Sequence, residues 1–300
     1  MAKKNEEVST VRRAKHGGIL TVIFAILSFL WIAPILIVFL NSFKRKALIF
    51  THPFSLSCYS ITEGWDKFKA GITRAFCGWL NYSNGIRKTN LWECFGTSLF
   101  ITIGSVALII LCCSMCAWYI TRVHTKVTKT IYVLCLFSMI VPFQMVMFTL
   151  SKFANILHLS NPLGIIIVYL GFGAGLAVFM FTGFVKGISL EIEEAAMIDG
   201  CSPLQTFFKV VFPILKPTTV TVAILEAMWV WNDYLLPYLV LSSKYRTIPI
   251  AVQYLKQSHG QIDWGAMMAV LVLAILPIII FYIACQKYII EGVLAGAVKG

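Results

Sequence analysis

Long apolar runs without a charge constrain this chain more than any other feature. A helix needs roughly 20 consecutive apolar residues to cross the hydrocarbon core of a bilayer. Five runs reach that length, at 16–43, 94–121, 130–151, 153–185 and 264–286. A sixth, at about 217–241, is apolar apart from Glu226 and Asp233. We therefore predict an all-α membrane protein with six transmembrane helices within residues 17–290, and both termini on the same side.

The composition and the charge exclude two other classes of protein. Hydrophobic residues make up 59% of the 300 residues and charged residues only 13%, which rules out the solvated surface of a soluble domain. The formal net charge of +12 does not indicate nucleic acid, because no aromatic and basic groove motif accompanies it. Residues 1–16 form a basic tail. We expect the run that follows to be an anchor, since it is too long for a signal peptide and lacks a small-residue cleavage site.

The distribution of Lys and Arg residues does not indicate which side of the membrane each loop occupies. Cytoplasmic loops normally carry an excess of them, but here the two sides receive nearly equal numbers. The cause is the basic loop at about 44–93, which lies on the side opposite the N-terminus. Cys58, Cys77 and Cys94 lie in or beside this loop, and the sequence leaves open whether any two of them form a disulfide.

One polar stretch, 189–217, interrupts the apolar sequence and predicts two short helices. Acidic residues open the first of them, where the positive end of the helix dipole favours them: Glu191, Glu193 and Glu194. Gly200 can take the left-handed conformation that ends a helix. Helices of about ten residues are marginal alone in water, so this pair must pack against something.

The second short helix carries a complete start signal. Ser202 is placed as the N-cap, Pro203 at the first helical position and Gln205 as the partner in a capping box. We expect Pro213 to end the helix. Residues at helical spacing predict a single apolar face made of Leu204, Phe207, Phe208 and Val211.

The sequence contains no motif for enzymatic chemistry. It has no Walker A loop, zinc-protease motif or nucleophile elbow, and its five histidines are scattered. The glycines at 171, 173 and 175 follow no predicted strand, so we interpret them as sites of close helix packing rather than as a nucleotide loop. We therefore predict that this chain is not an enzyme and binds no metal or cofactor itself.

Several separate motifs resemble one known family. Residues 194–200 read EAA, three further residues and Gly; NSFK stands at 41–44, WND at 231–233, DWG at 263–265 and GAVKG at 296–300. These motifs resemble the permease subunits of binding-protein-dependent ABC importers, and specifically the MalG-like class that takes up carbohydrates. The resemblance covers nearly the whole chain and is poorest in the loop 44–93.

This resemblance implies the partners and the orientation. The chain is expected to pair with a homologous second permease in the cell membrane, with two ATPase subunits that hold ATP and Mg and with an extracytoplasmic sugar-binding protein. The EAA loop, about 186–216, is then cytoplasmic between spans four and five, as are both termini, 1–16 and 291–300. It implies an ATPase contact made by Glu194, Ala195, Ala196, Asp199, Gly200, Leu204, Phe207, Phe208 and Pro213. Asp199 stands at a helix end where the dipole disfavours an acid, and either a partner or solvent can compensate for it.

A further group of residues is predicted to line the translocation pathway. An ionised carboxylate in hydrocarbon costs several kcal/mol unless it faces water or a partner, so we expect Glu226 to face the pathway or the second permease. Trp229, Asn232 and Asp233 extend this polar stripe toward the outer mouth, where an interfacial belt is the alternative. Gln144, near the centre of the third span, is a pathway residue or bonds a neighbouring helix.

The loop 242–265 resembles, by position, the loop that reaches into the binding protein in MalG-like permeases. That resemblance implies contacts from Tyr254, Gln257 and Gly260, and an ordered surface loop is the alternative. The sequence does not name the sugar, neutral or anionic. Two other functions remain open, namely an ion-coupled secondary transporter that uses Glu226 and Asp233, and a membrane scaffold that tethers a cytosolic protein.

Overall fold

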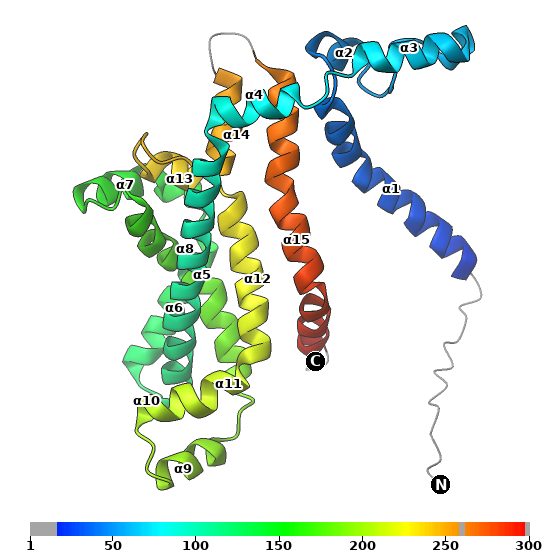
Figure 1. The fold of residues 1–300 in the computed structure, drawn as a ribbon. Coiled ribbons are helices and arrows are strands. Elements are labelled where there is room, and N and C mark those ends of the chain that lie inside the picture. The colour runs from blue at the N-terminus through cyan, green and yellow to red at the C-terminus, as the bar shows by residue number, and fades with distance from the viewer. Residues whose placement is uncertain (1–16, 258–261, 298–300) are drawn as a thin grey trace, which may run out of the picture.

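The computed structural model describes residues 17–257 and 262–297, and within them the chain is helical without a strand (Figure 1). A lone antiparallel bridge joins Lys44 and Phe76. The helices are α1 (Gly17–Ser42), α2 (Lys46–Thr51), η1 (Ile61–Glu63), α3 (Trp65–Ala75), α4 (Leu80–Thr89), α5 (Leu91–Arg122), α6 (Lys126–Ile140), α7 (Phe143–Ile156), α8 (Pro162–Val185), α9 (Leu190–Ile198), α10 (Pro203–Thr206), η2 (Phe207–Val211), α11 (Phe212–Ile214), α12 (Lys216–Asn232), α13 (Leu235–Val240), α14 (Ile248–Gln257) and α15 (Trp264–Ala297).

Four of the described helices are long and apolar enough to cross a membrane by themselves: α1, α5, α8 and α15. They correspond to the first, second, fourth and last predicted spans. The predicted start of the fourth span, at residue 153, is wrong, because 153–156 end α7 and Pro162 begins α8 behind an Asn161 N-cap. Two further spans are obtained only if each of two bent helix pairs, α6 with α7 and the helix 203–214 with α12, is counted as one span.

The third predicted span is not a continuous helix. It divides into α6 and α7, whose axes differ by 107° across Val141 and Pro142. Pro142 has no N–H to continue the helical ladder and disfavours a helical conformation at the residue before it. The third span, predicted as the run 130–151, is therefore interrupted near its middle. Gln144 lies exposed in the first turn of α7 rather than at the centre of a span.

The fifth predicted span is also interrupted. α12 is 17 residues long and ends at Asn232; Asp233 then separates it from the short helix α13. At the other end α12 meets the preceding helix, 203–214, at an angle of 77°. This sharp bend turns the polar stretch away from the membrane-crossing direction.

α5 and α8 form the closest helix pair in the bundle, and glycine permits it. A Cβ on Gly173 of α8 would lie 2.6 Å from Ile109 Cδ1 of α5, and one on Gly175 would lie 2.8 Å from the carbonyl oxygen of Cys135 on α6. The predicted packing role is thus confirmed for these two glycines. It is wrong for Gly171, which faces open space.

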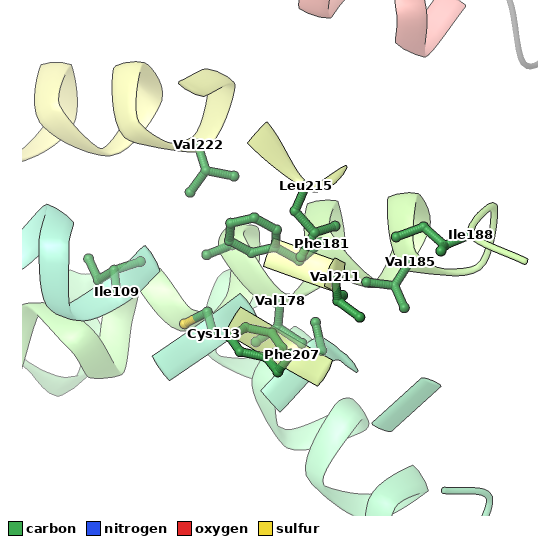
Figure 2. Packing of buried hydrophobic residues seen from close by; sticks show 12 residues of the cluster. Ile109, Cys113, Val178, Phe181, Val185, Ile188, Phe207, Val211, Leu215 and Val222 are labelled. Atoms are coloured by element: carbon green, nitrogen blue, oxygen red, sulfur yellow. The ribbon is translucent and has the colours of Figure 1, made fainter. Parts of the chain in front are cut away.

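The largest apolar core joins α5 and α8 to the segment that leads into α12 (Figure 2). Phe181 and Val178 of α8 converge there with Phe207 and Val211 of η2, and all four are fully or almost fully buried. The polar stretch is therefore anchored on the bundle, as the marginal stability of short helices requires.

The two ends of the molecule differ in what they present (Figure 1). α2, α3, α4 and α14 lie at one end, and α9 to α11 lie at the other. α1 packs mainly on α15 and leaves most of its apolar surface uncovered within this chain; Trp31 is 82% exposed. Such a surface must face lipid or another membrane helix.

Candidate functional site

The polar stretch begins with α9, which follows the local signals in the sequence. Ser189 is the N-cap position, Glu191 and Glu193 stand in the first turn, and the helix ends at Ile198. Gly200 has φ +87°, the left-handed region that the sequence predicted for it. A side chain there would be strained even though no atom lies within 4 Å of a Cβ at this position.

A buried ion pair ties α9 to the end of α5. The carboxylate of Glu193 is only 2% exposed and accepts hydrogen bonds from Arg122 Nη2 at 2.7 Å, Arg122 Nε at 3.0 Å and Trp118 Nε1 at 2.8 Å. Arg122 Nη2 also donates to the carbonyl of Ile188 at 3.0 Å. We call this group the α5–α9 brace. Both the carboxylate and the guanidinium make hydrogen bonds beyond the ion pair itself, which a buried pair needs in order to be favourable.

Sequence reasoning missed the brace. Glu193 was identified only as one of three acids that favour the helix start, and its neighbour was chosen as the functional residue. Trp118 and Arg122 are four residues apart and therefore share a face of α5. This spacing could have indicated that both side chains bind the same group. Nothing local in the sequence pairs that face with a residue 71 positions further on.

The rest of α9 presents a free face. Glu194, Ala195 and Asp199 are exposed, and neither acid has an ion-pair partner among the described residues. Ile198 is 85% exposed, although it is large and apolar. Ala196 is buried against the chain itself. The structure thus brings an acid and an uncovered apolar side chain together on a helix that is fixed from behind.

The second short helix begins as predicted and then continues further than predicted. The Ser202 side chain accepts from the backbone N–H of Gln205, whose side chain accepts from the Ser202 N–H in return. The helix widens to a π-helical turn over η2, where the Phe212 N–H donates to the Phe207 carbonyl. It then runs through Pro213 to Ile214, so the prediction that Pro213 ends it is wrong. The wider turn precedes the proline and accommodates its missing N–H.

The apolar residues of this helix divide into two faces instead of one. Phe207 and Val211 are fully buried in the core shared with α8. Leu204 is 59% exposed and Phe208 46% exposed. The prediction of a single apolar face is therefore wrong: the buried pair attaches the helix to the bundle, and the other pair is left on the surface. Phe207 is a core residue of this chain.

Glu226 is placed inside the bundle. It is 2% exposed, and its Oε2 lies 2.9 Å from the point where a Cβ on Gly173 would stand. No hydrogen-bond partner for this oxygen exists among the described residues. Within this chain the carboxyl group is covered by α8 and does not lie on the outer surface.

Three other predicted pathway residues, Trp229, Asn232 and Asp233, lie where α12 ends. Asp233 Oδ1 accepts from the N–H groups of Leu235 and Leu236 and so caps α13, while the Tyr169 hydroxyl donates to Asp233 Oδ2 at 3.1 Å. Trp229 packs edge-on against the same tyrosine, with ring centroids 5.4 Å apart, and is 40% exposed. These contacts give Asp233 a structural role at the helix break.

A small cavity of about 290 Å³ adjoins this break. It combines the aromatic rings of Trp231 and Tyr234 with the amide side chains of Asn232 and Gln253. Asn232 is exposed and donates to the carbonyl of Met228. The cavity thus offers rings on which a sugar can stack and amides that can bond hydroxyl groups.

The loop 242–265 contains a helix, α14, which packs on α4, α5 and α15. Tyr254 is 46% exposed, and the guanidinium of Arg246 lies 4.0 Å from its ring centroid. Gln257 is the last residue of α14. Gly260 lies outside the described residues.

The cysteines in and beside the first loop, Cys58, Cys77 and Cys94, are free thiols in the described structure.

The NSFK motif holds the first loop together. Asn41 Nδ2 donates to the carbonyls of Ile37 and Pro53. The ammonium group of Lys44, which is 4% exposed, donates to the carbonyls of His52 and Pro53. Burial lowers the pKa of Lys44 from its usual value.

The DWG motif joins α4 to the start of α15. The ammonium of Lys88 contacts Asp263 Oδ2 at 2.5 Å, and Asp263 Oδ1 accepts from the Ala266 N–H. Partial burial would raise the pKa of Asp263, but the hydrogen bond from Lys88 and the one from the Ala266 amide outweigh it, so the pKa is lowered. A Cβ on Gly265 would lie 2.5 Å from Asn81 Oδ1, so only glycine allows this contact.

Comparison with known proteins agrees with the resemblance in the sequence. Residues 109–294 match the family model described as binding-protein-dependent transport system inner membrane component. The chain is 38% identical over 282 residues to a probable starch degradation products transport system permease protein, AmyC, of Thermoanaerobacterium thermosulfurigenes, covering 94% of this chain and 96% of that one. It is 32% identical to the multiple sugar-binding transport system permease protein MsmG of Streptococcus mutans, covering 94% of each chain.

A solved structure shares the fold. One chain in the crystal structure of a bacterial ABC transporter involved in the import of the acidic polysaccharide alginate superposes with a TM-score of 0.70 and 21% identity, covering 96% of this chain and 99% of that chain. The family match spans more than half of the residues and includes α9 to α11. The chain therefore belongs to the binding-protein-dependent transport system inner membrane components, the permease subunits of ABC importers.

Proposed function

We propose that this chain is one of two permease subunits of an ATP-driven carbohydrate importer. Several of its relatives are sugar-transport permeases by name, including a melibiose, raffinose and stachyose import permease of Bacillus subtilis that is 30% identical over 295 residues. The observation that carries the proposal is the helix pair α9 to α11, which is fixed to the bundle from behind and presents Glu194, Leu204 and Phe208 on its surface. ATP and Mg belong to separate ATPase subunits, and this chain holds no cofactor.

The ATPase contact is assigned to the exposed part of this helix pair. Glu194 offers a carboxylate to a cation on the ATPase, and Ile198, Leu204 and Phe208 offer uncovered apolar surface. Burial of such side chains is worth roughly 1.5–3 kcal/mol each, enough for a stable contact once the helices are already ordered. Phe207 supports this contact from inside the chain and does not take part in it.

The second permease and the lipid are assigned to the uncovered membrane surfaces. α1 is the largest of these. Another is an apolar cavity of about 560 Å³ between α5, α12 and α15, lined for example by Ile103, Ala227 and Phe281. The sugar-binding protein is assigned to the opposite end, where α4 and α14 lie (Figure 1). The EAA loop and both termini are then cytoplasmic.

The mechanism follows from how the helix pair is attached. Closure of the ATPase moves α9 and the helix 203–214 as one unit. The α5–α9 brace transmits that movement to α5, and the buried Phe207 and Val211 transmit it to α8. The two membrane helices rotate together, because their glycine contact leaves no room for sliding. The cavity beside Asn232 is the place where sugar released from the binding protein first meets this chain.

Uptake by the reconstituted complex tests the proposal. Proteoliposomes that contain this chain and its copurifying subunits are offered labelled maltotriose, raffinose and arabinotriose with internal ATP. Uptake of at least one of them that requires ATP and the binding protein is expected. Uptake driven by a proton gradient without ATP would support the ion-coupled transporter, and no uptake despite a stable complex with a cytosolic protein would support the scaffold.

A further inference from the structure

A basic cavity lies at the ends of α5, α6 and α8, beside the α5–α9 brace. Its volume is about 690 Å³, and no carboxylate is among its lining residues. The basic side chains around it are Arg122 from α5, His124 from the loop, Lys126 and Lys129 from α6, and Lys186 from the end of α8. None of the three lysines has an ion-pair partner in the described part of the chain. Their charges are therefore available to an anion.

An unpaired buried hydroxyl lines the same cavity. Thr182 of α8 is 3% exposed, and its Oγ1 makes no hydrogen bond to any described protein atom. Buried hydroxyl groups normally have a hydrogen-bond partner, and a buried hydroxyl without one costs free energy. Among the described residues that line this cavity, it is the one buried side chain without a hydrogen-bond partner, and a ligand oxygen would satisfy it.

The start of α6 adds a third feature that suits an anion. Thr125, Lys126, Thr128 and Lys129 line the cavity at the N-terminus of a 15-residue helix, whose dipole places partial positive charge there. Thr125 and Thr128 cap each other's backbone N–H groups. Arg122 contributes as well. It uses Nε and Nη2 on Glu193 and Ile188, while its Nη1 makes no hydrogen bond among the described residues. Hydroxyl, guanidinium, ammonium and a helix N-terminus together match the oxygens of a phosphate group.

The position of the cavity indicates a phosphate carried by a lipid. It lies where two helices that are long and apolar enough to cross a membrane end, and the ends of such helices are where lipid headgroups are expected. Ile120 and Tyr132 give it an apolar side. α6 also carries exposed apolar side chains, among them Ile131 and Leu134, so the surface of this helix suits a lipid environment. Basic cavities between membrane helices on the cytoplasmic side commonly hold anionic headgroups.

We propose that this cavity binds the phosphate of an anionic glycerophospholipid and that the lipid completes the coordination of Arg122 in the α5–α9 brace. The assignment to the cytoplasmic leaflet rests on the proposed function, and the binding site itself does not. A bound lipid would then hold the end of α5 and, through Glu193, the helix that receives the ATPase. Lipid composition would thereby affect how firmly this helix is held.

Lipid retention measured by native mass spectrometry tests the proposal. The full chain, with any subunits that copurify, is placed in nanodiscs of phosphatidylglycerol or phosphatidylcholine and released into the spectrometer. The variant K126Q/K129Q/K186Q should retain phosphatidylglycerol roughly 100-fold less well, from the typical contribution of each cation near a membrane surface. The matched control K67Q/K69Q/R87Q, with the same charge change in the first loop, should retain it normally.

Thr182→Val is the second variant, because it removes the unpaired hydroxyl without changing the charge. It should weaken phosphatidylglycerol retention several-fold at an unchanged melting temperature. Normal retention in both cavity variants would overturn the proposal. Displacement of the lipid by excess inorganic phosphate would overturn the lipid assignment and show that the site takes a free anion. These measurements involve no transport, so their failure is distinguishable from a failure of the proposed function.

Discussion

Removing Glu193 should release α9 from the bundle without unfolding the membrane helices. Loss of one partner from a buried ion pair typically costs about 3–5 kcal/mol. The Arg122 side chain keeps 19% exposure and can regain water, so we take a lower value of about 2–3 kcal/mol for Glu193→Ala. At about 1.4 kcal/mol for each tenfold change, the population with α9 detached rises about 30- to 150-fold. This cost is local because Phe207 and Val211 still anchor the neighbouring helix.

Hydrogen exchange and the coupling ratio measure this effect. The backbone amides of α9 should exchange at least about 30-fold faster in Glu193→Ala, in line with the population estimate, and those of α5 and α8 should not change. In proteoliposomes the variant should hydrolyse ATP while transporting less sugar per ATP. The control is Glu191→Ala, which removes an exposed acid from the same first turn and so accounts for the helix dipole.

A double-mutant cycle separates the ion pair from other effects. Arg122→Met removes the cation that Glu193→Ala would leave without a partner, so the combined variant should be less destabilised than the sum of the single variants. Additive effects, or unchanged α9 exchange in Glu193→Ala, would refute the assignment of the brace.

Three further changes test other parts of the structure. Leu204→Asp should abolish copurification of the ATPase at an unchanged melting temperature; retention of the ATPase would contradict the surface assignment. Gly173→Val places a Cβ 2.6 Å from Ile109 and should destabilise the bundle by about 1–3 kcal/mol, seen as a lower melting temperature. Asp263→Asn should cost about 0.5–1 kcal/mol at pH 7. Because the pKa of Asp263 is lowered, its ion pair with Lys88 contributes above the unfolded pKa of about 3.9 and is lost as the pH falls through the folded pKa. The difference in unfolding free energy between Asp263→Asn and the unchanged chain should therefore vanish in acid. An equal loss of stability at pH 7 and in acid would count against the ion pair.

Sequence reasoning succeeded where the signal is local. The capping box at Ser202 and the left-handed Gly200 depend on neighbours within a few residues, and both appear as predicted. The apolar runs located four spanning helices because a bilayer requires length and hydrophobicity alone. The run 130–151 did not reveal the 107° break at Pro142, because hydrophobicity alone does not report the direction of a helix.

The candidate site was less predictable because its roles depend on tertiary contacts. Phe207 and Phe208 are adjacent and equally apolar, yet the first is fully buried and the second 46% exposed. Glu193 and Glu194 show the same contrast, since one is in the brace and the other faces outward. Periodicity gives the face of a helix, but it does not say which face meets the bundle.

The two attachments of the helix pair have different consequences for transmitting movement. The brace is directional and polar, so it fixes the position of α9 relative to the end of α5. Phe207 and Val211 pack in the core shared by α5 and α8, where the Phe207 ring lies 5.4 Å from that of Trp118. This contact is apolar and resists separation, but it is less specific about orientation. A pair held by both cannot rotate without moving α5 and α8 together. Because these helices already meet at Gly173, a displacement of the helix pair would reach the region of Glu226 through packed side chains.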